Sequence, residues 1–190
     1  MVDWVRRNPG WSLLGLGLVL AVALYAPTLG RGLVNYDDTW LVRDNHVLRH
    51  PSWSSLAAVF DPAPSGRLAL GAEYLPIRDL SIMADLAVWG DHYQGLHLVN
   101  LVVYLASIAL VFAMLDGFGT GRTIAGLAAL IWAIHPSHAE SVAWLSERKG
   151  ILAGLFMIAS GHAWVRYREG RSNGWLVLAA VAAVAGVWSK

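Results

Sequence analysis

Cysteine is absent from this chain of 190 residues. Its absence excludes disulfide bonds, thiolate metal sites and a cysteine nucleophile, and it leaves no sign of the redox compartment. Charge is scarce as well, because only 14% of the residues are charged, against about 25% in a typical soluble domain. The net charge of +1 gives no electrostatic basis for binding nucleic acid.

The chain is rich in apolar residues, in contrast to its low content of charged ones. They make up 56% of the chain, and the mean hydropathy is +0.49. Several of the ten tryptophans lie at the ends of apolar runs, as expected for rings anchored at a membrane interface. We therefore predict an all-α polytopic membrane protein with a single membrane domain. Its five expected transmembrane helices are at about 11–28, 97–115, 121–135, 150–166 and 173–189.

The first apolar run, Trp11 to Ala26, has two interpretations. It follows Arg6 and Arg7, so it resembles a cleaved signal peptide with a basic start and an apolar middle. We prefer a retained span, because the run reaches the length needed to cross a bilayer. In addition, Pro27-Thr28-Leu29 is a poor cleavage site.

The largest polar segment, residues 30–96, follows this first run. Two short helices are expected in it, at about 52–60 and 76–89, with prolines at or near their starts. In the second, apolar residues recur on one face, while Arg78, Ser81 and Asp85 fall on another. Both are too short and too charged to span, so we predict interfacial amphipathic helices in an outer loop.

Basic residues set the expected orientation. With the N-terminus in the cytoplasm, the cytoplasmic side receives Arg6, Arg7, Arg122, Arg166, Arg168 and Arg171. The short loops of the other side carry only Arg148 and Lys149, besides the terminal Lys190. The segments 30–96 and 135–149 then emerge together on the non-cytoplasmic face.

Two adjacent acids, Asp37 and Asp38, follow the first span. Adjacent carboxylates repel each other, which raises the pKa of one unless a cation is close. Such a group would suit a general base near the membrane surface. The alternative is a solvated turn with an Asx cap.

His135, His138 and Glu140 lie in the polar loop between the third and fourth spans. Histidines three residues apart on a helix can share a metal, but Pro136 disfavours a regular helix here and no third strong ligand is near. We therefore predict no metal site, and a divalent metal is the weaker alternative. We favour hydrogen bonding to a polar headgroup or a substrate over a helix cap.

Arg148 and Lys149 open the fourth span. Two cations at a helix N-terminus oppose the helix dipole unless an anion is present. A bound phosphate would relieve this repulsion. Snorkelling of both side chains to the interface explains the pattern equally well.

Four motifs in this order resemble one family: Asn-Tyr-Asp-Asp-Thr at 35–39, Tyr-Leu-Pro-Ile-Arg-Asp-Leu-Ser at 74–81, Gly-Leu-His-Leu-Val-Asn at 95–100, and His-Pro-Ser-His-Ala-Glu-Ser-Val-Ala-Trp-Leu-Ser-Glu-Arg-Lys at 135–149. They look like the N-terminal part of bacterial relatives of the transmembrane and tetratricopeptide-repeat O-mannosyltransferases. These are type C glycosyltransferases. The resemblance covers nearly the whole chain.

The resemblance implies an enzyme that transfers a sugar from a polyprenyl-phosphate donor to an acceptor outside the cytosol. Asp37 or Asp38 would be the base that deprotonates the acceptor hydroxyl, and Arg148 with Lys149 would lie near the donor phosphate. His135, His138, Glu140, Tyr74 and Arg78 would shape the pocket. The expected location is the bacterial inner membrane, with membrane lipid as a partner and the site facing the periplasm.

The family continues through further spans, so the resemblance implies a chain that is truncated or reduced. A second hypothesis is a catalytically inactive short relative that serves as an accessory subunit of a larger membrane complex, such as a respiratory or photosynthetic assembly. Helices rich in small residues would allow it to pack closely against other membrane subunits.

Overall fold

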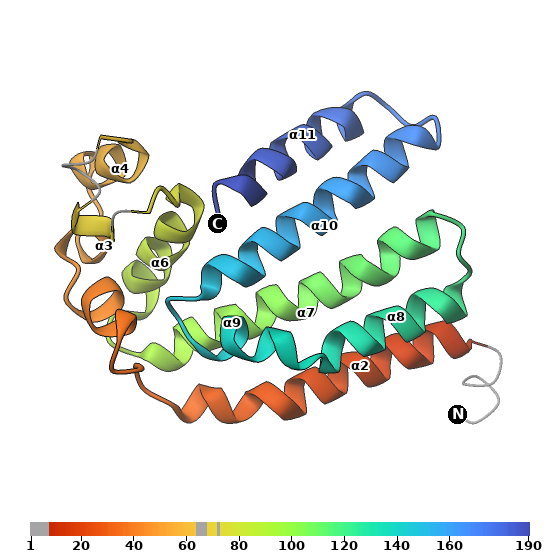
Figure 1. Ribbon diagram of the computed structural model, residues 1–190, viewed down its shortest axis with the longest axis horizontal. Coiled ribbons are helices and arrows are strands. Elements are labelled where there is room, and N and C mark those ends of the chain that lie inside the picture. Colours follow the sequence, from red (N-terminus) through yellow and green to blue (C-terminus); the bar gives the residue numbers. More distant parts are fainter. Residues whose placement is uncertain (1–7, 64–67, 72) are drawn as a thin grey trace.

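The computed structural model describes residues 8–63, 68–71 and 73–190, and this part of the chain is helical with no strand. The predicted all-α class is therefore confirmed. Arg6 and Arg7, on which the expected orientation partly rests, lie outside the described residues. Five helices lie alongside one another (Figure 1): α2 (Pro9–Tyr25), α7 (Tyr93–Gly117), α8 (Arg122–Ile134), α10 (Arg148–Arg168) and α11 (Gly174–Val187).

Two of the helices in the described residues are long and apolar enough to cross a membrane. One is α2 together with the 3₁₀ turn η1 (Ala26–Gly30), which makes 22 residues, and the other is α7 with 25. A span needs about 20 residues at 1.5 Å per residue. The apolar helices α8 and α11 have 13 and 14 residues. Helices thus occupy all five apolar runs, and crossing is supported by length and composition for two of them.

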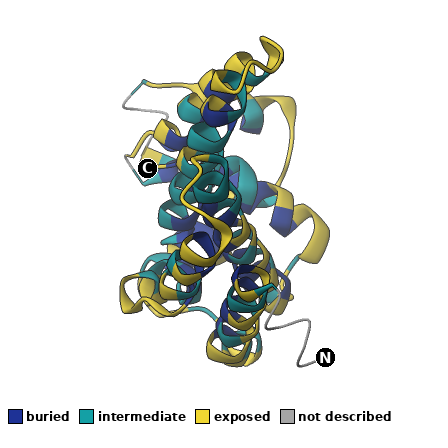
Figure 2. Ribbon diagram, turned by 90° about the vertical axis from the view of Figure 1, so that its right-hand side faces the viewer, coloured by how far each residue is buried: buried dark blue, intermediate teal, exposed yellow. Residues whose placement is uncertain are grey.

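Small residues allow α2 and α8 to pack closely. A Cβ atom added at Gly126 of α8 would lie 2.4 Å from the carbonyl oxygen of Gly10 in α2. One added at Gly17 would lie 3.2 Å from the Cα atom of Leu130. A larger residue at Gly126 would therefore force the two helices apart. Figure 2 shows the buried residues running through the middle of the bundle.

The segment between α2 and α7 forms a small helical layer at one end of the bundle, at the left in Figure 1. Its elements are η2 (Thr39–Arg43, a π-helix), α3 (His46–Arg49), α4 (Trp53–Phe60), η3 (Leu68–Leu70) and α6 (Pro76–Trp89). The Ser52 side chain caps α4 by accepting a hydrogen bond from Ser55 N, and Pro76 starts α6. The layer has its own apolar core, which includes Leu48, Leu70 and Ile82.

The polar side of α6 does not face solvent as an amphipathic interfacial helix would require. Arg78, Asp79 and Asp85 are all buried. The ionic side chains face protein partners instead, as described below. Periodicity alone does not reveal this, because it separates polar from apolar residues but does not identify what each face contacts.

Candidate functional site

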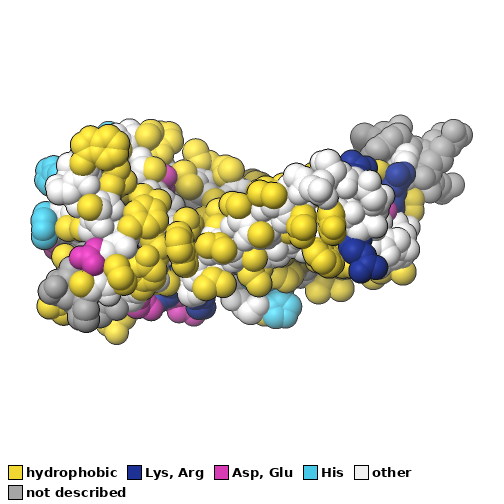
Figure 3. All heavy atoms as spheres, turned by 90° about the horizontal axis from the view of Figure 1, so that it is seen from above, with side chains coloured by type: hydrophobic (Ala, Val, Ile, Leu, Met, Phe, Trp, Pro, Cys, Tyr) yellow, Lys and Arg dark blue, Asp and Glu magenta, His cyan; other side chains and the backbone are white. Residues whose placement is uncertain are grey.

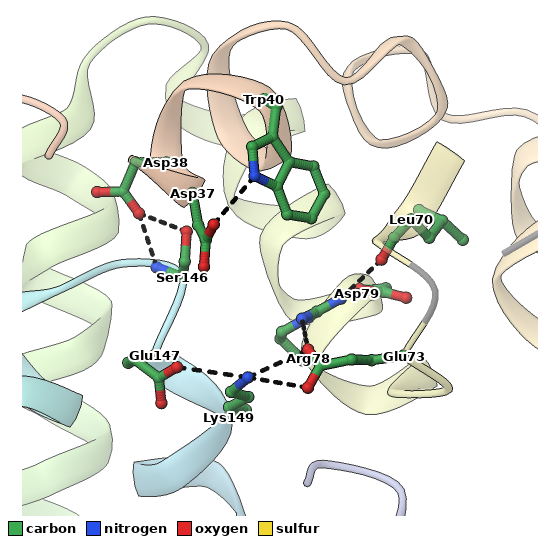
Figure 4. Close-up of polar contacts among 10 residues, drawn as sticks. All are labelled: Asp37, Asp38, Trp40, Leu70, Glu73, Arg78, Asp79, Ser146, Glu147 and Lys149. Atoms are coloured by element: carbon green, nitrogen blue, oxygen red, sulfur yellow. Dashed lines mark hydrogen bonds and ion pairs between the residues drawn. The ribbon is translucent and has the colours of Figure 1, made fainter. Parts of the chain in front are cut away.

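Asp38 joins the small helical layer between α2 and α7, called the outer layer below, to the loop that precedes α10. Its side chain is fully buried. Oδ1 accepts hydrogen bonds from the backbone N (2.8 Å) and the hydroxyl of Ser146, and Oδ2 accepts one from Val34 N at 3.0 Å. Figure 4 shows the Ser146 contacts. The carboxylate thus holds together two segments that lie 108 residues apart in the sequence.

The neighbouring acid, Asp37, has a different environment. It is half-buried, and its Oδ1 accepts a hydrogen bond from Trp40 Nε1 at 3.1 Å. Its Oδ2 makes no hydrogen bond with any residue that the structure describes. Figure 4 shows the two acids turned toward different partners. Of the two acids, Asp37 is therefore the one that keeps an oxygen without a hydrogen-bond partner among the described residues.

Arg148, predicted to lie near a phosphate, is instead enclosed by protein acceptors. It is fully buried. Nε donates to Asn100 Oδ1 at 2.6 Å and Nη2 donates to the carbonyl oxygen of Leu96 at 2.9 Å. Nη1 forms an ion pair with Asp85 Oδ2 at 2.5 Å. In this arrangement Arg148 holds α6, α7 and α10 together, because its planar fork can bind several acceptors at once.

Burial dominates the electrostatics of this ion pair. It raises the pKa of Asp85 above its ordinary value, and the nearby Arg148 charge offsets only part of that rise. A buried charge of this kind depends on its partner for stability. Neither Asp85 nor Asn100 was predicted as a functional residue. The sequence alone offers no signal that pairs them with Arg148, which lies 48 residues beyond Asn100.

Lys149 and Arg78 both contact the carboxylate of Glu73 (Figure 4). Lys149 Nζ lies 3.1 Å from both carboxylate oxygens of Glu73 and 3.3 Å from Glu147. Arg78 Nη1 donates to Glu73 Oε2 at 3.0 Å, while its Nε and Nη2 donate to Asp79. Burial lowers the pKa of Lys149, but the Glu73 hydrogen bond and the charges of Glu147 and Glu73 outweigh it, so the pKa is raised.

The remaining predicted pocket residues lie in two other places. Tyr74 packs against Trp188, with ring centroids 6.4 Å apart, and donates to the carbonyl oxygen of Phe60 at 3.4 Å. His135 and Glu140 are exposed on the loop between α8 and α10. The loop itself contains η4 (Pro136–His138) and α9 (Ala139–Ala143). Tyr74 is thus separate from the histidine loop.

His138 lines a cavity of about 150 Å³ among α7, α8, α9 and α10. Its ring centroid lies 4.6 Å from that of Trp132 and 5.5 Å from that of Tyr104. Both rings also line the cavity, as do Ser141, Gly150 and Gly154. His138 and Trp132 also border a second hollow, which lies on the exposed side of α8 near Ile131. In the part of the chain that the structure describes, no three His, Asp or Glu side chains are grouped as metal ligands.

The environment of His138 predicts a pH-dependent stability. Burial, with His135 as a smaller cause, lowers the pKa of His138. As the pH falls through about 6.5, the unfolded chain takes up this proton before the folded protein does. We therefore expect the melting temperature to drop as the pH falls through that value toward the folded-state pKa.

Thermal melts of the detergent-solubilised protein between about pH 5 and 8 would measure this effect. His138→Gln should flatten the acid side of the profile, and substitution of the exposed His92 is the matched control. A His138→Gln profile that follows the wild-type curve would refute the prediction.

Ser146→Ala should destabilise the protein. It removes the hydroxyl that donates to buried Asp38 but leaves the backbone N–H in place. A hydrogen bond to a charged group contributes about 1.5–3 kcal/mol, and we expect a loss of stability in that range. Denaturant unfolding measures it, with exposed Ser172→Ala as the control. Equal unfolding midpoints for the two variants would contradict the proposed link.

The amino-acid sequence is similar to those of several curated proteins that share one name, protein O-mannosyl-transferase. The chain is 26% identical over 181 residues to Protein O-mannosyl-transferase Tmtc1 of Drosophila melanogaster, covering 90% of this chain and 20% of that protein. For human Protein O-mannosyl-transferase TMTC2 the identity is 28% over 176 residues, with coverages of 83% and 20%. For human Protein O-mannosyl-transferase TMTC4 it is 27% over 195 residues, with coverages of 87% and 24%.

The chain spans about a fifth of the length of the curated relatives it matches. No family model matches it, and no solved structure matches it. The resemblance first seen in the four motifs thus extends over most of this chain and about a fifth of each relative. Over most of its length, this chain resembles the protein O-mannosyl-transferases.

Proposed function

We propose that this chain is a membrane glycosyltransferase that moves a sugar from a polyprenyl-phosphate donor to an acceptor hydroxyl. The reaction would take place at the end of the bundle that carries the outer layer. The similarity to O-mannosyl-transferases supports sugar transfer as the class of reaction. It does not favour the accessory-subunit hypothesis.

We propose further that all five helices cross the bilayer. α10 has 21 residues, which is long enough to span, and α8 and α11 pack alongside α7 and α10. A bilayer around α7 would therefore also surround them. Figure 3 shows apolar side chains along much of the bundle, with basic side chains gathered toward the end away from the outer layer. By the positive-inside rule that end is cytoplasmic, and the site faces the periplasm.

In this proposal Asp37 is the general base. Its free oxygen would accept the proton of the acceptor hydroxyl, while the Trp40 indole holds the other oxygen. Asp38 acts as a positioning residue through Ser146. Lys149 and Arg78 supply positive charge for the donor phosphate. Arg148 holds the helices that carry them.

The remaining predicted residues would have supporting roles. His138, beside the cavity, would contact the donor, and the exposed His135 and Glu140 would lie on the rim of this region. Tyr74 would contribute to the wall through its packing on Trp188. No step of the proposed reaction requires a metal, because a lysine and an arginine can offset the charge of the phosphate.

The observation that carries the proposal is the link between Asp38 and Ser146. Ser146 and Lys149 are three residues apart, so their Cα atoms are at most about 11 Å apart. This short segment, which contacts Asp38 at Ser146 and carries Lys149, supports a site in which the acid pair and a cation act on a single sugar-phosphate headgroup. A base and a phosphate-binding cation must both reach the same headgroup in order to act on one bond.

A transfer assay with two donor classes tests the function. The purified chain, reconstituted in vesicles, would receive labelled polyprenyl-phosphate mannose or a nucleotide-linked mannose, together with serine- and threonine-containing peptides. We expect labelled peptide from the lipid-linked donor only. Folded protein that forms no product from the lipid donor would contradict the proposal, as would product from the nucleotide donor alone.

A further inference from the structure

The charged cluster beside the acid pair contains a carboxylate that bridges two cations. Both oxygens of Glu73 lie 3.1 Å from Lys149 Nζ, and Oε2 also accepts from Arg78 Nη1 at 3.0 Å. The Glu73 side chain is 49% exposed, whereas those of Arg78 and Lys149 are 2% and 16% exposed. An accessible anion is thus bound by two largely enclosed cations.

The other acids of the cluster are less exposed. Asp79 is fully buried against Arg78, and the Glu147 side chain is 19% exposed. Glu73, in contrast, precedes α6 in a short non-helical stretch. Of the three acids, Glu73 is therefore the one whose carboxylate is most accessible to a competing anion.

We propose that Glu73 occupies the position that the donor phosphate takes, and that loading the donor exchanges one anion for the other. This inference rests on the proposed function. An Arg–Lys pair that accepts the paired oxygens of a carboxylate can also accept two oxygens of a phosphate. In the empty site, the Glu73 carboxylate then takes the place of the donor phosphate. It pairs with both cations until the donor binds.

The exchange agrees in charge with the donor class of the proposed function. A sugar linked to a lipid through one phosphate is a phosphodiester with a single negative charge, the same as the carboxylate it displaces. Asp79 and Glu147 pair with the same two cations and remain in place during the exchange. A diphosphate-linked donor would add excess negative charge beside Asp79 and Glu147. The site should therefore favour phosphodiester-linked sugars over diphosphate-linked ones.

Donor binding to Glu73→Gln tests the exchange. The probe is a short-chain isoprenyl phosphoryl-mannose, titrated into the full chain in nanodiscs of zwitterionic lipid. If Glu73 holds the cations about nine-tenths of the time, removing its charge should tighten binding about tenfold. Lys149→Gln should abolish that gain. Glu73→Asp, whose shorter arm reaches the two cations less well, should give an intermediate gain.

A matched control exists at the other end of the bundle. Glu169 bridges Arg166 and Arg171 at 3.1 and 3.4 Å, so Glu169→Gln removes an equivalent bridge away from the site. It should leave donor binding unchanged. Melting curves of each variant confirm that the comparison is made between folded proteins.

Four outcomes would count against the inference. Unchanged or weaker binding by Glu73→Gln, with sugar transfer intact, would remove the exchange but leave the proposed function standing. If Glu73→Gln tightened binding of a diphosphate-linked donor as much as binding of the phosphodiester donor, the predicted charge selectivity would be wrong. Competition by phosphatidylglycerol as strong as that by unlabelled donor would assign the cations to bilayer headgroups. Absence of both binding and transfer would instead remove the proposed function itself, and the exchange with it.

Discussion

Asp37→Asn should lower the rate of sugar transfer by about 10²- to 10⁴-fold, which is the usual contribution of a general base. The substitution keeps the shape of the side chain and an oxygen that can accept from Trp40. It removes the basicity of the free oxygen. Because Asp37 is half-buried and does not take part in the link to Ser146, the melting temperature should remain close to that of the wild type.

Two controls make this result specific. Asp44→Asn changes an exposed acid of the same outer layer, which is paired with Arg43, and should leave transfer unchanged. Trp40→Phe keeps an aromatic ring but removes the indole N–H that orients Asp37, so it should slow transfer less than Asp37→Asn does. Transfer by Asp37→Asn at the wild-type rate would rule out Asp37 as the base.

Asp85→Asn should produce the largest loss of stability. It leaves the fully buried Arg148 without the carboxylate that balances its charge. Breaking a buried ion pair by removing one partner costs about 3–5 kcal/mol. The effect should appear as a lower denaturant midpoint, because the guanidinium connects α6, α7 and α10.

The double variant Asp85→Asn/Arg148→Met distinguishes an ion pair from a simple packing effect. Removing both charges takes away the unpaired cation, so the double variant should be more stable than Asp85→Asn alone. Asp91→Asn, at an exposed acid paired with Arg49, is the control and should change stability little. Additive losses in the double variant would contradict the proposed coupling.

Much of the helical framework could be predicted from the sequence. Continuous apolar runs indicated the helices that became α2, α7, α8, α10 and α11, and Pro76 marked the start of α6. These signals are local: whether a segment becomes a helix depends largely on residues that are near one another in the sequence. The number of helices that cross a membrane does not follow in the same way, because α8 and α11 are short and their setting depends on their neighbours.

The roles of single site residues were harder to predict. Asp37 and Asp38 are chemically identical neighbours, and only the folded chain shows that one is bound to Ser146 while the other keeps an oxygen free. A cation at a helix start looks the same in sequence whether it faces a phosphate or a buried acid. For Arg148 the acid is Asp85, 63 positions earlier in the chain, and the pairing requires three helices to be packed.

The measurement that tests the central claim most directly compares Asp37→Asn with Asp38→Asn in one preparation. Sugar transfer from polyprenyl-phosphate mannose and thermal unfolding would be recorded for both. The account predicts that Asp37→Asn loses transfer but melts like the wild type, whereas Asp38→Asn melts at a lower temperature. It would be contradicted if Asp37→Asn kept full transfer, or if Asp38→Asn left the melting temperature unchanged.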